Sequence, residues 1–501
     1  MSCRRSPAGA SLVVLVAWGA TACTSPSFAR LRLAPPAVAV VVRPWIVVKD
    51  RLPERPIGIS ENVFYSSDRY YPDRRLRQAE SLRRIGGRTI RGMEGNIGDF
   101  LLWAPPPFIG PDPRLTAYHP QHGYMAELYH PDGSLTKPMD FDEFIATGRE
   151  AGVTEFFYII GIDAIRADPA HWQWIVPRAL ETTVAAAAAL ARRCREQRLH
   201  MWFEIGNETD KADETLVAWT PEAYADVVRQ LSRAIKAEYP EARIGINGGF
   251  TDDWLPRVIP AVRDDADFVA AHAYGARRKG EIARANVALD AAFREAPRAR
   301  RWPIAVTETS AYDFRGRMPN DLQHATRNFV RMGVNLSQRR VGYMHFWTDR
   351  AADVVDPDAK SAFSLDGDVL PMGRVLGIWN EFLKDQLVAV DRSDKRVNAF
   401  ATRSARSGAV TVFLANRRAS AVPVRVRIAG GVPGPRGDVW AFTGRDGGDR
   451  DPQWGPAGTI DVADNTFVWK LPPFAVVVID VPAAAATGGA PARTPRASGL
   501  R

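Results

Sequence analysis

Two glutamates stand out because each lies near the end of an apolar run that is typical of a buried strand. Glu208 closes "MWFEIGNE" and Glu308 lies in "PIAVTETS". An ionised carboxylate is costly in an apolar interior unless it is paired or solvated. A salt bridge at the rim of the fold is the structural interpretation of either residue alone. The functional interpretation is a pair of catalytic carboxylates at the mouth of a barrel.

A pair of carboxylates on one rim could hydrolyse a glycosidic bond. With retention of configuration, that reaction needs a protonated acid for the leaving oxygen and an ionised nucleophile about 5 to 5.5 Å away. The two environments must separate the two pKa values, so that one carboxyl stays neutral near pH ~6 while the other is charged. We therefore expect Glu208 and Glu308 to lie close together in different surroundings.

The elements that would position these residues are apolar runs alternating with helical stretches. Parallel strands covered on both sides are apolar throughout, so the pattern predicts an α/β fold with a (β/α)8 TIM barrel. Glu208 and Glu308 end the fourth and seventh runs, and the carboxyl ends of barrel strands meet on one face. The runs are 56–60, 87–92, 155–161, 201–208, 243–249, 267–275, 303–310 and 343–348.

The hydrophobic pattern of the sequence changes near residue 386. Short stretches with alternating apolar residues, separated by turns, predict a C-terminal β-sandwich over 386–482. The barrel would then occupy 51–385. The segment 30–50 holds a strand-like run that could return to pair with the sandwich. The tail 483–501 has no apolar pattern, and we expect it to be disordered.

Residues 1–29 resemble an export signal. Arg4 and Arg5 precede an apolar stretch too short to span a membrane comfortably, and small residues follow at Ser27 and Ala29. A secreted or periplasmic protein is therefore expected. Lipidation at Cys23 is the alternative, although Ala20 stands where such a motif usually has Leu.

Net charge and the absence of certain motifs argue against nucleic-acid binding, a bound cofactor and a zinc site. The 501 residues carry a formal net charge of +9, too mild to argue for nucleic acid, though it leaves room for an acidic polysaccharide. No Ser-centred elbow, phosphate-binding loop or dinucleotide fingerprint occurs, so no cofactor is expected. His119 and His122 could suggest a zinc site, but no carboxylate or cysteine cluster accompanies them.

"EIGNE" on the fourth run and "VTET" on the seventh resemble the signature of retaining (β/α)8 glycoside hydrolases that carry their acid and nucleophile on strands four and seven. Within this clan, β-xylosidases, α-L-arabinofuranosidases and heparanase-like β-glucuronidases share a barrel followed by a β-sandwich, and "LPPFAVVVIDV" is similar to their closing strand. The resemblance covers roughly 50–482. It implies Glu208 as acid/base and Glu308 as nucleophile, with an oligosaccharide or polysaccharide as substrate.

Several companion residues have physical roles to offer. Asn207 can bond the hydroxyl next to the anomeric carbon. Arg91 could hold the nucleophile ionised by lowering its pKa, with a structural ion pair as the alternative. His272 and Tyr274 end the sixth run, where the clan often has an aromatic residue or a histidine bonded to the nucleophile. A satisfied core histidine is the alternative for His272.

Aromatic residues suggest where a sugar would lie. Trp347 on the eighth run could form a floor for the ring, or be a plain core tryptophan. A long segment after the second run is rich in aromatic residues and histidines, and long loops inside compact domains are often functional. Asn96 and Trp103 are the substrate-binding candidates within it.

The sequence also departs from the resemblance. Arabinofuranosidase relatives have Gly-Gly directly after the strand-two arginine, whereas here Gly86 and Gly87 precede Arg91. This difference leaves the sugar open. A carbohydrate-binding barrel without turnover is a second hypothesis, opposed by the retention of both carboxylates. A metal-dependent amidohydrolase is a third hypothesis. It would require a His-x-His motif on the first strand, and residues 56–62 contain none.

Overall fold

The computed structural model describes most of the region from residue 37 to residue 484. The described residues are 37–62, 74–92, 139–166, 178–211, 219–274, 280–294, 302–311, 318–350, 356, 358–430 and 433–484. The expected export signal, Cys23 and nearly all of the 483–501 tail lie outside them. So do Asn96, Trp103, His119 and His122. None of the described helices is both long enough and apolar enough to cross a bilayer.

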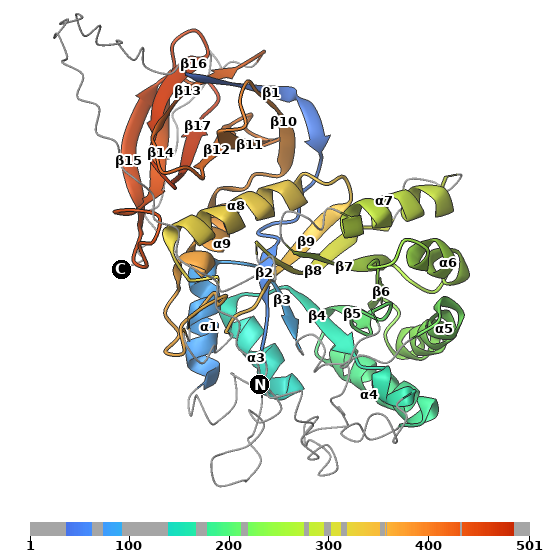
Figure 1. Ribbon diagram of the computed structural model, residues 1–501. Helices are drawn as coiled ribbons and strands as arrows, with labels where there is room; N and C mark the ends of the chain where they lie inside the picture. The colour runs from blue at the N-terminus through green and yellow to red at the C-terminus, as the bar shows by residue number, and fades with distance from the viewer. Residues whose placement is uncertain are drawn as a thin grey trace, which may run out of the picture. The chain divides into compact units, whose positions relative to one another are not determined.

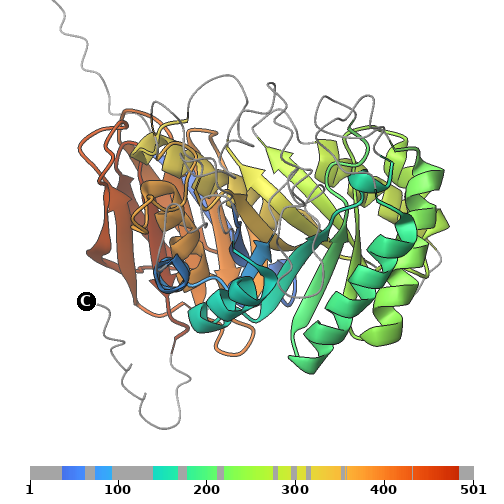
Figure 2. The same cartoon turned by 90° about the horizontal axis from the view of Figure 1, so that it is seen from below.

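Eight parallel strands close into a barrel in chain order. Helices surround it on the outside, as Figure 1 and the turned view in Figure 2 show. This confirms the predicted barrel. Its strands are β2 (Ile57–Ser60), β3 (Thr89–Gly92), β4 (Glu155–Ile160), β5 (His200–Ile205), β6 (Arg243–Asn247), β7 (Phe268–Tyr274), β8 (Ile304–Ser310) and β9 (Val341–Trp347).

The barrel helices begin at residues suited to that position. Thr220 accepts a hydrogen bond from the Ala223 amide ahead of Pro221, and Asp140 forms a capping box with Glu143. These caps satisfy amides that have no partner within a helix. The helices are α1 (Arg74–Ile85), α3 (Phe141–Ala151), η3 (Asp163–Ile165), α4 (Leu180–Glu196), α5 (Pro221–Glu238), α6 (Trp254–Ala261), α7 (Gly280–Ala292), α8 (Leu322–Leu336) and α9 (Pro371–Phe382).

A nine-stranded, mostly antiparallel sheet forms the second part of the fold, in the order β15-β14-β17-β12-β11-β10-β1-β13-β16. It encloses a valine-rich core of its own, in agreement with the predicted sandwich. β1 (Val38–Lys49) pairs antiparallel with β10 and parallel with β13, so the chain enters this sheet before it forms the barrel. The other strands are β10 (Gln386–Arg392), β11 (Val397–Arg403), β12 (Val410–Asn416), β13 (Val422–Ile428), β14 (Arg436–Thr443), β15 (Gln453–Asp461), β16 (Thr466–Leu471) and β17 (Val476–Val481).

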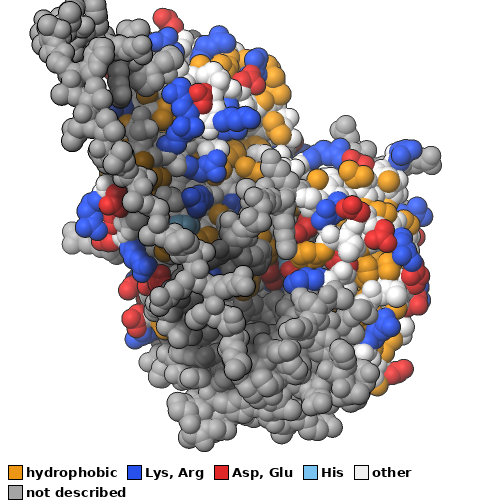
Figure 3. Space-filling view, viewed as in Figure 1, with side chains coloured by type: hydrophobic (Ala, Val, Ile, Leu, Met, Phe, Trp, Pro, Cys, Tyr) orange, Lys and Arg blue, Asp and Glu red, His pale blue; other side chains and the backbone are white. Residues whose placement is uncertain are grey.

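Charged side chains of both signs lie on one face of the described part of the molecule. On the face drawn in Figure 3, Lys and Arg side chains are interspersed with Asp and Glu. Within the described part of that face, no broad area of a single charge is evident. This arrangement agrees with the mild net charge of the sequence.

Trp379 on α9 joins the barrel side to the sheet. Its ring stacks on Phe329 of α8 at 4.6 Å and on Phe413 of β12 at 4.3 Å, and it is fully buried. Truncating a buried tryptophan removes these contacts and leaves a cavity. We expect Trp379→Ala to lower the free energy of unfolding by about 3–5 kcal/mol in chemical denaturation. Val468→Ala on β16 is the matched control because its side chain is exposed, and an equal loss there would contradict the assignment.

Candidate active site

A left-handed turn after β5 carries Asn207 and Glu208 at the carboxyl end of the barrel. Gly206 has φ +72° and Glu208 has φ +50°. A Cβ on Gly206 would meet the Thr209 side chain at 2.5 Å, so glycine is required there. A non-glycine residue with positive φ is uncommon and is often found at functional sites. The strand therefore ends three residues before the glutamate, which the turn then presents.

Glu308 lies in β8 with both carboxylate oxygens bonded. Nη1 of Arg91 donates to Oε1 at 2.7 Å, and the Tyr274 hydroxyl donates to Oε2 at 2.5 Å. Burial, together with the negative charge of Glu308, raises the pKa of Tyr274 well above its ordinary value. The phenol therefore stays protonated and keeps donating. These two bonds fix the orientation of the Glu308 carboxylate.

Arg91, near the end of β3, links several residues of the site through its guanidinium. Its guanidinium is fully buried and donates to Glu308, to Glu204 at 2.9 Å from Nε, and to Asn207 at 2.9 Å from Nη2. A further bond from Nη1 reaches the Ser60 hydroxyl at 3.2 Å. The ion pair expected between Arg91 and Glu308 is thus present, and it belongs to a larger network.

His272 of β7 lies between the two glutamates. Its Nδ1 is 2.9 Å from Oε1 of Glu208 and 3.4 Å from Oε2 of Glu308. Burial alone would lower the pKa of His272, but the carboxylates of Glu308, Glu204 and Glu208 raise it to about 10. The ring therefore carries a positive charge that faces the carboxylates of Glu208, Glu308 and Glu204.

The carboxylates of Glu208 and Glu308 approach closely. One oxygen of each, together with a His272 ring nitrogen, lies in a group whose members are all within 4.8 Å of one another. Retaining glycosidases place their carboxyl groups about 5–5.5 Å apart, and inverting enzymes about 6.5–9.5 Å apart. At least one oxygen pair between the two carboxyl groups is thus closer than the range typical of inverting enzymes.

The charge state of Glu208 differs from the expectation. Burial raises its pKa, but the hydrogen bond and charge of His272, and then Lys211, bring the pKa below its ordinary value. Lys211 Nζ lies 2.9 Å from Oε2 of Glu208. In the free protein, the proton expected on the acid therefore resides on His272 instead. The reason is that two cations face a carboxylate whose burial alone would have kept it neutral.

The structure brings most of the predicted residues together. Glu208, Glu308, Asn207, Arg91, His272 and Tyr274 form one connected cluster. Trp347 of β9 meets the Tyr274 ring edge to face at 6.1 Å, and its side chain is half-buried beside that cluster. Asn96 and Trp103 remain predictions because they lie outside the described residues.

Sequence reasoning missed Glu204, Lys211 and Asn247. Glu204 is completely buried in β5 and accepts a 2.5 Å hydrogen bond from Nδ2 of Asn247. A carboxylate inside "MWFEI" was a usable signal, because burial of an acid demands partners. Lys211 and Asn247 gave no comparable signal, since polar residues at the end of a strand or after it are common.

Among the described residues, one group has the residue types and spacing to hold a metal ion, namely Glu208, His272 and Glu308. Both oxygens of each glutamate and Nδ1 of His272 already bond one another or the side chains of Arg91, Tyr274 and Lys211. The arrangement satisfies its own charges and can transfer protons, so we interpret it as an acid–base cluster.

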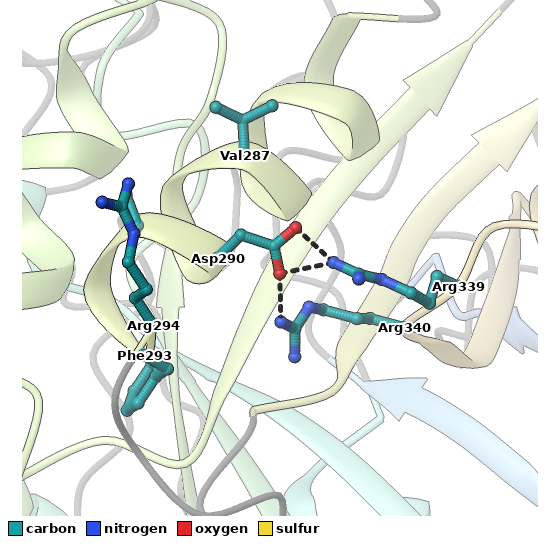
Figure 4. Close-up of a pocket in the computed structure, with 7 residues that line it drawn as sticks. Val287, Asp290, Phe293, Arg294, Arg339 and Arg340 are labelled. Atoms are coloured by element: carbon teal, nitrogen blue, oxygen red, sulfur yellow. Dashed lines mark hydrogen bonds and ion pairs between the residues drawn. The ribbon is translucent and has the colours of Figure 1, made fainter.

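A cavity of about 540 Å³ lies elsewhere in the molecule. Arg339 and Arg340 immediately precede β9, and Asp290 is near the C-terminal end of α7, which places the cavity at the amino end of the barrel. Both arginines pair with Asp290 in Figure 4. This cavity is at the end opposite the paired glutamates and contributes nothing to their chemistry.

Comparison with protein-family models found no match, and comparison with curated proteins found none either. Solved structures gave matches over nearly the whole chain. An α-L-arabinofuranosidase from Thermotoga maritima, solved with arabinose, is 18% identical with a TM-score of 0.65, covering 89% of this chain and 100% of the other.

Two further structures share the same architecture. A family 44 xyloglucanase from Paenibacillus polymyxa has 11% identity and a TM-score of 0.62, covering 89% of this chain and 99% of the other. A family 30 endoxylanase from Clostridium papyrosolvens has 13% identity and a TM-score of 0.56, covering 89% and 100%. At these identities the likeness concerns the fold, so the chain has the barrel-and-sandwich architecture of these glycoside hydrolases, as its sequence resemblance implied.

Proposed function

We propose that the protein is a retaining glycoside hydrolase that cleaves O-glycosidic bonds of an oligosaccharide or polysaccharide by double displacement. The observation that carries the proposal is the close approach of Glu208 and Glu308 at the ends of barrel strands β5 and β8. The fold shared with arabinofuranosidases, a xyloglucanase and an endoxylanase supports the same reaction class.

In the first step, an oxygen of Glu308 attacks the anomeric carbon, and the bond to the leaving oxygen breaks as Glu208 protonates that oxygen. The proton comes from His272, whose Nδ1 is 2.9 Å from Glu208. In the second step, Glu208 takes a proton from water and returns it to Nδ1 of His272, the water oxygen bonds the anomeric carbon, and Glu308 leaves. The sugar is released with its original configuration.

The neighbouring residues have positioning roles in this scheme. Arg91 and Tyr274 hold the Glu308 carboxylate, and each stabilises its negative charge. Asn207 would bond the hydroxyl beside the anomeric carbon, a contact that strengthens as oxocarbenium character develops. Trp347 would lie under the sugar ring, with Asn96 and Trp103 contributing from the long segment after β3.

The substrate class is proposed from the fold likenesses and from the sequence resemblance. The relatives named above support a pentose-containing glycan, so the arabinofuranosidase and xylosidase types come first, and a glucuronidase type remains compatible with the resemblance. We also propose export by the segment 1–29, with a lipid anchor at Cys23 as the variant form. The catalytic part would span 51–385 and the sandwich 386–482.

Hydrolysis of aryl xyloside, arabinofuranoside, glucoside and glucuronide, beside xylan and xyloglucan polymers, tests this function. Activity on one sugar that disappears in both Glu208→Gln and Glu308→Gln is the expected result. Cleavage of polymers alone would indicate an endo-acting enzyme. Glycan binding without any cleavage would overturn the proposal in favour of a non-catalytic carbohydrate-binding barrel.

The pH profile should respond to Lys211. Its positive charge helps lower the pKa of Glu208, so Lys211→Met should raise that pKa. The limb of the pH–rate profile that reports ionisation of Glu208 should then move to higher pH. Lys236→Met is the control, because Lys236 pairs with Asp267 away from the cluster. If this part of the pH–rate profile did not move in Lys211→Met, the charge of Lys211 would not influence the pKa of Glu208.

A further inference from the structure

We propose that Glu204 is a positioning residue that fixes the guanidinium of Arg91 and the ring of His272, and so acts on both Glu308 and Glu208. The inference rests on the proposed function for its effect on turnover. Its effect on His272 can be measured without any substrate. Glu204 itself is fully buried and cannot touch a sugar.

Glu204 is held as a charged group by four partners. Oε2 accepts from Nε of Arg91 at 2.9 Å, while Oε1 accepts from Asn247 at 2.5 Å and from the Thr307 hydroxyl at 3.2 Å. Nε2 of His272 lies 3.7 Å from Oε1. Burial raises the pKa of Glu204, but Arg91 and then His272 outweigh it and lower the pKa to about 2. The carboxylate is therefore ionised at any working pH.

The bond to Nε sets the direction of the whole Arg91 head group. A guanidinium is planar and its five N–H bonds form a rigid fork. With Nε anchored on Glu204, Nη1 points to Glu308 and Nη2 to Asn207. Glu204 thus orients Nη1 of Arg91, which holds the proposed nucleophile Glu308. It also orients Nη2 of the same planar group, which bonds the Asn207 amide expected to contact the substrate.

Glu204 also acts on the second glutamate, Glu208, through the ring of His272. Its Nδ1 bonds Glu208, while Nε2 on the opposite side of the ring faces Glu204. Glu204 therefore stabilises the cationic ring that supplies the proton. The charged or titratable groups packed around this ring are Glu204, Glu208 and Lys211 from β5 and its following turn, Glu308 from β8, Arg91 from β3 and Tyr274 from its own strand.

Glu204→Gln removes the charge at nearly constant shape. The oxygen of the substituted side chain can accept from Arg91, which leaves the new amide group facing Asn247. Oδ1 of Asn247 has no hydrogen-bond partner among the described residues, so a turned Asn247 amide can accept from that new amide group. Thr307→Val is the matched control, because it deletes a neutral hydrogen bond to the same oxygen and leaves the charge in place.

The test is NMR titration of the His272 imidazole with ¹⁵N-histidine-labelled protein, with the signal assigned from its loss in His272→Gln. Wild type should stay protonated well into the alkaline range, since the pKa of His272 is about 10. Glu204→Gln should lower that midpoint by about one pH unit or more, and Thr307→Val should not move it. A role limited to stability would lower the unfolding midpoint of both variants without separating their titrations.

A kinetic measurement on a hydrolysed aryl glycoside adds the effect on turnover. Glu204→Gln should lower kcat by about 10- to 100-fold with little change in KM, as is typical when a supporting partner is lost. An unshifted His272 midpoint in Glu204→Gln would overturn the inference. A wild-type His272 midpoint near 6.5 would also overturn it, and this result does not require the variant to fold. If no glycoside is cleaved, the proposed function fails while the titration still decides the role of Glu204.

Discussion

Replacing Glu308 by Gln should reduce kcat by about four orders of magnitude or more, because a carboxamide cannot attack the anomeric carbon. The fold should survive. The oxygen of the new side chain can still accept from Arg91, and the Tyr274 hydroxyl can turn to accept from the new amide. The measurement is steady-state hydrolysis of the best aryl glycoside, alongside a thermal unfolding scan of each protein.

The matched control for that variant is Asp290→Asn. It also converts a carboxylate to an amide and disturbs pairs with two arginines, but at the opposite end of the barrel. Its kcat should stay within about twofold of wild type, since surface changes away from a site have small effects. If Glu308→Gln kept a tenth or more of wild-type turnover, Glu308 could not be the nucleophile.

Replacing Glu208 by Ala should produce a loss that depends on the leaving group. General acid catalysis contributes about 10²- to 10⁴-fold, and most of this is needed only when the leaving oxygen is a poor one. Natural glycosidic bonds should therefore lose nearly all turnover. A dinitrophenyl glycoside should still form the glycosyl-enzyme, because its leaving group departs without a proton.

Added azide should then restore turnover in Glu208→Ala and yield a glycosyl azide of retained configuration. The small anion can enter the space left by the side chain and needs no general base. Glu208→Gln is the companion control, since it fills the space and should respond weakly to azide. Equal losses on natural and dinitrophenyl substrates, without rescue by azide, would remove Glu208 from the acid/base role.

The barrel was predictable because its strands are buried on both faces and leave apolar runs in the sequence. The runs at 155–161 and 243–249 correspond closely to β4 and β6. The end of β5 was less predictable, since the run extends to Glu208 whereas the strand stops at Ile205. Gly206 and Glu208 leave the strand in left-handed conformations, which an apolar pattern does not reveal.

The polar network was only partly predictable. His272 and Tyr274 share one face of β7 by alternation, so their joint approach to the site follows from the sequence. Their partners do not. A register shift between Ala271 and His272 sets His272 opposite Glu308, yet its shorter contact is to Glu208, while Tyr274 bonds Glu308. Irregular registers of this kind depend on packing across the whole barrel.

The most direct test of the double-displacement mechanism is to trap its covalent intermediate. The protein would be incubated with the 2-deoxy-2-fluoro aryl glycoside of the sugar it cleaves, digested, and mapped by mass spectrometry. We expect one equivalent of fluoroglycosyl label on the peptide that contains Glu308, attached to that residue. A label on Glu208, or consumption of the reagent with no labelled peptide, would rule out this mechanism.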